Sequence, residues 1–195
     1  AEFVSATKRD SHSVRRPFTI DELRSVLAVC DDEWRSIVLC GIYTGQRLAD
    51  VANLRWRNID LQKQEIRLVS RKTNRRLTIP IAPTLLTHLE SLSSSDDADT
   101  PIHPKAATTL GKLGRVGTLS NQFSAILVNA GLRSESSLKK QGTGKGRHAR
   151  RKMNELSFHC LRHTAVTMLK EAGIPAAVVM ELIGHDSEQM SEHYT

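Results

Sequence analysis

The spacing of apolar residues changes character along this chain, and the change sets the fold class. Through residues 20–54, and again in 83–92, 120–130 and 157–183, apolar residues recur every three or four positions, as on one face of a helix. Residues 65–69 and 77–80 instead alternate apolar and polar side chains around a polar, basic turn, which is typical of a β-hairpin. The sequence therefore predicts an α+β, mostly α-helical domain with one small three-stranded antiparallel sheet, whose third strand is expected near 59–61.

Local signals set the ends of the expected helices. Thr19 and Glu22 form a capping box, which predicts that the first helix starts there. Gly45, Gly173 and Gly184 are expected to stop helices, and Ser157 to cap one. The stretch 101–117 has no assignment, because its glycines are expected to interrupt any regular element. Further helices are expected at 33–43, 47–54, 83–92, 120–130, 157–172 and 175–183, with a last short one starting near Ser187.

The charge balance favours a polyanionic partner. Lys and Arg number 28 against 21 acidic residues, a net charge of +7, so nucleic acid is the first expectation. No apolar run reaches the roughly 18 residues of a membrane span, so no membrane partner is expected. Three cysteines without a pairing framework predict a reducing compartment. The 195 residues fit one domain at 17–195, after a flexible lead-in at 1–16.

Two arginines, two histidines and a late tyrosine form the most specific group. Attack on a phosphodiester builds negative charge on its oxygens, and the planar, permanently charged Arg guanidinium is well suited to bind them. Arg47 follows Gly45 at an expected helix start, where free N–H groups also favour anions. His159 and Arg162 share a helix face, and we expect both half sheltered beside its apolar stripe.

Supporting roles are open to more than one interpretation. Asp50 could orient Arg47 or another site member, or could simply be an acid favoured near a helix start. Lys72, at the hairpin tip, could protonate a leaving oxygen or be merely solvated. His159 and His163 are four apart but have no Glu beside the first His, so no metal is expected.

Together these residues resemble the tyrosine recombinase, or phage integrase, family over about Thr19 to Thr195. The resemblance rests on five stretches: Thr-Gly-Gln-Arg-Leu-Ala-Asp around Arg47, the hairpin around Lys72, His-Cys-Leu-Arg-His-Thr from His159 through Arg162, Leu-Ile-Gly-His ending at His185, and Tyr194 nine residues later.

The resemblance implies the family's catalytic-domain fold and a site-specific DNA recombinase, or integrase. Tyr194 would attack the scissile phosphate and form a 3′-phosphotyrosyl bond, without metal, ATP or any other cofactor. Arg47, Arg162 and His185 would bind the phosphate oxygens. Lys72 would be the general acid, and His159 a base or hydrogen-bond partner.

The resemblance also implies the partners. Double-stranded DNA would be the substrate, cut by a tetramer, in the cytoplasm of a bacterium at its nucleoid. The family's N-terminal DNA-binding domain and its exchanged C-terminal segment are not in this sequence, so a monomer is expected in free solution.

Further basic residues are candidate DNA contacts. Arg71 and Arg75 flank Lys72 in the hairpin turn. The polar segment 132–156 is open to two interpretations, a solvated loop or a DNA backbone contact. Its seven candidate residues are Lys139, Lys140, Lys145, Arg147, Arg150, Arg151 and Lys152.

Two other function classes remain open at this stage. A type IB topoisomerase has a similar active site, but would relax any supercoiled plasmid as a monomer. A DNA-binding module with an inactive site would bind DNA without cutting it. The spacing from His185 to Tyr194 and the modest size favour a recombinase.

Overall fold

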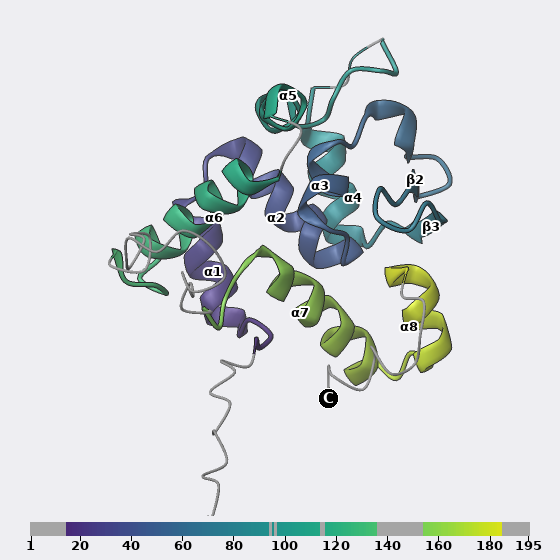
Figure 1. The fold of residues 1–195 in the computed structure, drawn as a ribbon. Coiled ribbons are helices and arrows are strands. Elements are labelled where there is room, and N and C mark those ends of the chain that lie inside the picture. The colour runs from purple at the N-terminus through teal and green to yellow at the C-terminus, as the bar shows by residue number, and fades with distance from the viewer. Residues whose placement is uncertain (1–14, 94, 96, 114–115, 136–153, 185–195) are drawn as a thin grey trace, which may run out of the picture.

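The computed structural model describes residues 15–93, 95, 97–113, 116–135 and 154–184. Within these residues the chain is mostly helical with one small sheet, which confirms the predicted fold class (Figure 1). The elements are α1 Ile20–Val29, α2 Asp32–Thr44, α3 Leu48–Ala52, a 3-10 turn η1 Trp56–Asn58, β1 Ile59–Asp60, β2 Glu65–Val69, β3 Arg76–Pro80, α4 Pro83–Ser91, α5 Pro104–Leu113, α6 Gly117–Asn129, α7 Phe158–Glu171 and α8 Ala176–Ile183.

The sheet is the predicted antiparallel meander. Its order is β1-β2-β3, and Leu68 pairs with Leu77 across the hairpin. Every second residue of β2 and β3 is buried, so one face packs on the core and the other meets solvent. The short third strand also lies where the sequence places it, with Ile59 opposite Ile66.

The predicted helix signals are confirmed with one difference. The Thr19 side chain accepts from the Glu22 N–H, while the Glu22 carboxylate accepts from the Thr19 N–H, completing the capping box. Gly45 and Gly184 end α2 and α8 in the left-handed conformation, with φ of 62° and 72°. Ser157 occupies the N-cap position of α7 but makes no side-chain cap bond there.

The stretch without an assignment contains a helix. Gly111 lies inside α5 and Gly117 opens α6, so the expectation that these glycines interrupt regular structure is wrong. A Cβ at either glycine would meet no atom within 4 Å. Ala106 and Leu110, four apart, are buried, and this apolar contact outweighs the modest helix cost of one exposed glycine.

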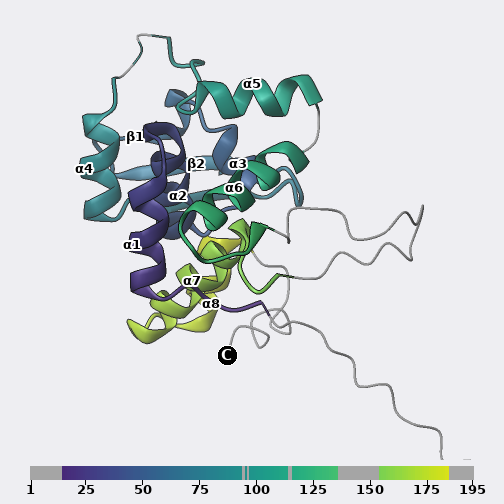
Figure 2. The same ribbon diagram turned by 90° about the vertical axis from the view of Figure 1, so that its left-hand side faces the viewer.

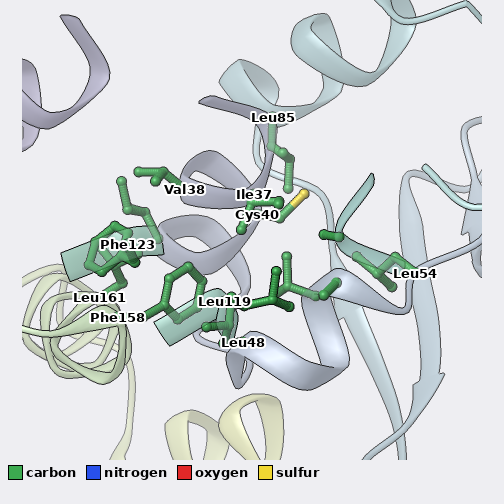
Figure 3. Packing of buried hydrophobic residues seen from close by; sticks show 14 of the residues in the cluster. Ile37, Val38, Cys40, Leu48, Leu54, Leu85, Leu119, Phe123, Phe158 and Leu161 are labelled. Atoms are coloured by element: carbon green, nitrogen blue, oxygen red, sulfur yellow. The ribbon is translucent and has the colours of Figure 1, made fainter. Parts of the chain in front are cut away.

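A large apolar core lies around α2. Figure 3 shows α2 and α3 side chains meeting residues of α4, α6 and α7. The Phe123 ring packs edge-on against Phe158 at 5.3 Å between centroids, and tilted against Trp34 at 5.9 Å. The start of α7 therefore belongs to the main core.

A second, smaller apolar cluster joins the later part of α7 to α8. Its buried members are Ala165, Val166, Val179 and Ile183. In Figures 1 and 2, α7 and α8 lie at the lower side of the molecule, and α8 contacts β3. The start of α7 thus packs in the main core, while α8, which follows it, contacts the sheet.

The start of the described chain is anchored. The Arg16 guanidinium binds the Glu22 carboxylate at 2.7 and 2.8 Å. The backbone N–H of Arg16 donates to the Glu155 carbonyl at 3.4 Å. The packed part of the chain thus includes the last residue of the predicted lead-in. No helix among the described residues is long and apolar enough to span a membrane.

Candidate active site

Arg47 stands at a turn where several elements meet. It is the N-cap residue of α3, two positions after the left-handed Gly45 that ends α2. Its side chain is half-buried, and Nη1 donates to the Ser70 hydroxyl at 3.3 Å. Because Ser70 directly follows β2, this bond aims the guanidinium toward the base of the hairpin turn.

Arg162 reaches the same turn from α7. Its Nη1 donates to the Gly45 carbonyl oxygen at 2.9 Å, across 117 residues of sequence. The two arginines are therefore brought together rather than facing separate surfaces. The expectation that Arg162 is half sheltered is wrong: it is only 1% exposed, because α7 packs directly against α2 and the side chain lies over the end of that helix.

His159 lies one turn before Arg162 and is half-buried. Burial is the main cause that lowers its pKa to about 3, and the nearby positive charges of His163, Arg15, Arg162 and Arg47 lower it further. The His163 ring stacks edge-on at 5.1 Å between centroids. His159 is thus neutral near pH 7, able to accept a proton beside two guanidinium groups.

Asp50 holds the backbone of the hairpin turn. Its Oδ1 accepts from the Arg71 backbone N–H at 3.0 Å, and the carboxylate is 6% exposed. Its Oδ2 is buried and has no hydrogen-bond partner within the described chain. The bond to Arg71 ties α3 to the turn that carries Lys72, another proposed member of the site, while a role of Asp50 in orienting Arg47 stays a prediction.

The hairpin turn presents the expected cations to solvent. Lys72 and Arg71 are exposed in the turn, and Arg75 is exposed where the chain re-enters β3. The Ser70 N–H donates to the Arg75 carbonyl at 2.9 Å, and the Asn74 N–H to the Ser70 carbonyl at 2.8 Å. These bonds fix the backbone at the base of the turn, while Lys72 is exposed to solvent.

Sequence reasoning missed two buried polar residues at this centre. Ser70 is 1% exposed and Gln46 is 2% exposed. The alternation that buries Ile66 and Leu68 continues to Ser70, so the strand period could have indicated a buried hydroxyl there. Gln46 gives no such signal, since its partner lies far away in the sequence.

A cavity of about 530 Å³ lies beside the same turn and is lined by several arginines. Arg57 pairs with Asp99, and Arg67 pairs with Glu65 at 2.7 Å, so these two cations are already matched by acids. The cavity is therefore a weaker candidate for an anion site than the Arg47 and Arg162 centre. Among the described residues, no group of three His, Cys, Asp or Glu side chains could hold a metal ion.

Several predicted residues lie outside the described residues. These are His185, Tyr194, the expected last helix near Ser187, and the basic residues Lys139, Lys140, Lys145, Arg147, Arg150, Arg151 and Lys152. The chain reaches that last part from Gly184, which is buried next to Leu77 of β3.

Known proteins similar to this chain share its architecture. The family model described as the phage integrase family matches residues 16–195. The integrase of Salmonella phage P22 is 24% identical over 175 residues, which cover 89% of this chain and 41% of that protein. The chain spans about half the length of the curated relatives it matches.

Two solved structures show the shared fold. The crystal structure of XerA recombinase has a TM-score of 0.67 and 20% identity, covering 98% of this chain and 61% of that one. A lambda integrase structure bound to DNA has a TM-score of 0.61 and 19% identity, covering 93% of this chain and 60% of that one.

Proposed function

Because this chain belongs to the phage integrase family, we propose that it is the catalytic part of a site-specific DNA recombinase. One observation carries the proposal: Arg47 and Arg162, from distant parts of the sequence, meet at the turn after α2, with neutral His159 beside them. Two guanidinium groups can bind the phosphate oxygens on which charge builds up, and a neutral imidazole beside them can accept a proton from a nucleophile.

The proposed reaction is an exchange of one phosphate ester for another. The Tyr194 phenol attacks the scissile phosphorus, its oxygen forms a bond to phosphorus, and the bond to the 5′ oxygen breaks. His159 accepts the phenolic proton, while Lys72 gives a proton to the leaving 5′ oxygen. The 3′-phosphotyrosyl ester keeps the bond energy, so the reverse attack by another 5′-hydroxyl rejoins DNA without a metal, ATP or another cofactor.

The two arginines have different tasks in this proposal. Arg47 is half-buried and can turn its remaining N–H groups toward a phosphate. Arg162 is almost fully covered in the free chain, so its contact with DNA requires that binding uncover the guanidinium. Until then its bond to the Gly45 carbonyl stabilises the turn from which Arg47 projects. His185 is proposed as a third phosphate ligand.

Double-stranded DNA is the proposed partner. The related lambda integrase is described as bound to DNA, and this chain carries a net charge of +7. Arg71 and Arg75 lie in the exposed turn next to Lys72, where they would contact the backbone near the scissile phosphate. We further propose a tetramer on DNA, a monomer for this chain alone, and action at a bacterial nucleoid in the cytoplasm.

A covalent-capture experiment tests the proposed reaction. The chain is incubated with a pool of nicked DNA duplexes of randomised sequence, in which cleavage releases a short strand and traps the ester. We expect DNA-linked protein on a denaturing gel. The adduct should disappear in Tyr194→Phe and persist in Tyr43→Phe, the matched control at the other tyrosine. An adduct that persists in Tyr194→Phe would move the nucleophile elsewhere.

The same preparation separates the recombinase from the competing functions. A recombinase leaves a supercoiled plasmid without the captured site untouched, whereas a topoisomerase relaxes it. Relaxation of any plasmid by the wild-type chain would favour the topoisomerase. Tight DNA binding with no adduct in any duplex would favour a binding module with an inactive site.

A further inference from the structure

Gln46 is a buried polar residue that connects distant parts of the chain. Its side-chain Nε2 donates to the Thr44 carbonyl at 3.1 Å and to the Leu182 carbonyl at 3.2 Å, 136 residues away. Carbonyl oxygens only accept hydrogen bonds, so the amide nitrogen must face them. The amide therefore joins the turn after α2 to the last residues of α8.

The three residues of this turn contact three different elements. Gly45 accepts the Arg162 bond from α7, and its Cα packs so closely on α8 that an added Cβ would lie 2.1 Å from the Ile183 Cδ1. Gln46 binds the α8 backbone, and Arg47 donates to Ser70 at the end of β2. Three consecutive residues thus bring together α7, α8 and the hairpin.

The end of α8 depends on few other contacts. Its buried residues Val179 and Ile183 belong to the small cluster with α7 and not to the main core. Its first residues are exposed, and Gly184, which caps its end, approaches Leu77 of β3. A short helix held by a small apolar cluster can shift or open more easily than one in the main core.

We propose that Gln46 is a positioning residue for the candidate active site, holding the end of α8 in register with the turn that carries Arg47. The idea rests on the proposed function. In the sequence, Gly184 ends α8 and His185 is the next residue, while Arg47 directly follows Gln46. A single carboxamide thereby fixes the relative position of two stretches that each supply a proposed phosphate ligand.

The variant Gln46→Met separates positioning from stability. Met has nearly the same volume and removes both donated bonds, and it also removes Oε1, which is buried without a hydrogen-bond partner in the described chain. Losing an unsatisfied acceptor offsets part of the lost bonding. We therefore expect a melting temperature within about 3 °C of the wild type.

The matched control is Ser36→Ala. Ser36 is 2% exposed and binds the buried His103 at 2.9 Å, so it is also a buried polar residue, but its hydrogen bond leads to His103 and not to the turn at 45–47. The Ser36→Ala variant should lower the melting temperature at least as much as Gln46→Met does, without affecting cleavage. The comparison tests whether loss of activity reports position or general stability.

The experiment measures three quantities for each protein: Kd for a captured nicked duplex, the rate of adduct formation at saturating DNA, and amide exchange of residues 176–184. For Gln46→Met we expect a Kd within about twofold of wild type, a rate lower by about 10- to 100-fold, and faster exchange in α8. Wild-type cleavage by Gln46→Met, or an equal loss in Ser36→Ala, would overturn the proposal.

Failure of the proposed function has a different signature. If the wild-type chain captures no duplex, the proposed function is rejected. The amide exchange rates of α8 then decide on their own whether Gln46 ties the turn at 45–47 to α8. Faster exchange in Gln46→Met than in Ser36→Ala supports the tie between the turn and α8. Equal exchange in the two variants and the wild type rejects it.

Discussion

His159 is kept neutral by its surroundings. Burial disfavours the charged imidazolium, and the cations at Arg47 and Arg162 disfavour it further, so its pKa falls to about 3. The free protein needs a neutral imidazole if that ring is to accept the phenolic proton. A phosphate bound between the arginines would offset their charge and make the ring a stronger base.

The titration of His159 is directly measurable. Because its pKa lies far below the ordinary value, we expect its Cε1–H resonance to stay constant from pH 8 to pH 5 in the free chain. An exposed histidine would shift with a midpoint near the ordinary 6.5. NMR with His159→Gln for assignment is the measurement, and a midpoint between 6 and 7 would refute the account of the site.

The sequence predicts a site residue when that residue belongs to a recognisable motif. It does not predict one whose role depends on a contact with a distant part of the chain. Arg47 and Arg162 were proposed as one site, and the structure brings them to one turn. Arg162 is more deeply buried than the sequence predicts. Helical spacing indicates on which face of a helix a residue lies, but not which elements pack over that face. Gln46 was missed because its partner, Leu182, is set by tertiary packing.

The turn between α2 and α3 depends on a glycine for two separate reasons. Gly45 has φ of 62°, and a Cβ there would collide with Ile183. Left-handed backbone costs an L residue about 1–2 kcal/mol, and overpacking adds about 1–3 kcal/mol. Gly45→Ala should therefore cost about 3 kcal/mol in urea unfolding, and cleavage should fall as the turn shifts.

Gly131→Ala is the control for that variant. Gly131 has φ of 73° but open space around a Cβ, so only the backbone cost applies, about 1–2 kcal/mol. Adding Ile183→Val, which lacks the colliding Cδ1, to Gly45→Ala should recover part of the loss. If Gly45→Ala and Gly131→Ala lower the free energy of unfolding equally, the collision with Ile183 does not destabilise the protein.

A buried histidine links three helices. His103, which is 0% exposed and just precedes α5, contacts the Val51 carbonyl at 3.0 Å and the Ser36 hydroxyl at 2.9 Å. Burial is the main cause that lowers its pKa to about 4. The unfolded chain takes up a proton near pH 6.5, but the folded chain does so only near pH 4.

This difference predicts acid-sensitive stability. The contribution is complete above about pH 6.5 and is lost as the pH falls toward 4, by up to about 3 kcal/mol. His103→Gln removes the titrating ring, so its stability deficit relative to wild type should shrink over that range. Urea unfolding of both proteins from pH 7.5 to 4.5 is the measurement. Parallel stability curves would rule out His103 as the cause.

Elements were predictable where the local pattern and the tertiary contacts agree. The β2–β3 hairpin alternates strictly and its register follows, so both strands were found. The α5 helix was missed because its glycine content outweighed a weak apolar pattern, Ala106 and Leu110, that only packing makes decisive. The end of α3 also differs from the prediction: the helix has five residues and ends at Ala52, before the expected end at residue 54.

The chain as a whole has a surplus of positive charge that the site does not account for. Seven Lys or Arg residues fall within 139–152 with no acid among them. We predict that these residues bind DNA phosphates. Neutralising all seven should lower the salt dependence of binding by about one unit of slope for each phosphate that the variant no longer neutralises.

The control for this charge effect removes exposed cations elsewhere. Neutralising Arg24, Lys63 and Lys112 should change the slope less per charge. Binding is followed by anisotropy of a labelled duplex between 50 and 300 mM salt. An unchanged slope in the sevenfold variant would show that the segment is a solvated loop.

The central claim is that the centre formed by Arg47, Arg162 and His159 directs the Tyr194 phenol onto a DNA phosphate. Peptide mapping of the captured adduct by mass spectrometry tests it most directly, because it reports which atom carries the DNA. The account predicts one modified peptide, with the nucleotide on Tyr194 through its 3′ phosphate, and none in Arg47→Met. DNA attached to Tyr43, to a serine, or through a 5′ phosphate would contradict it.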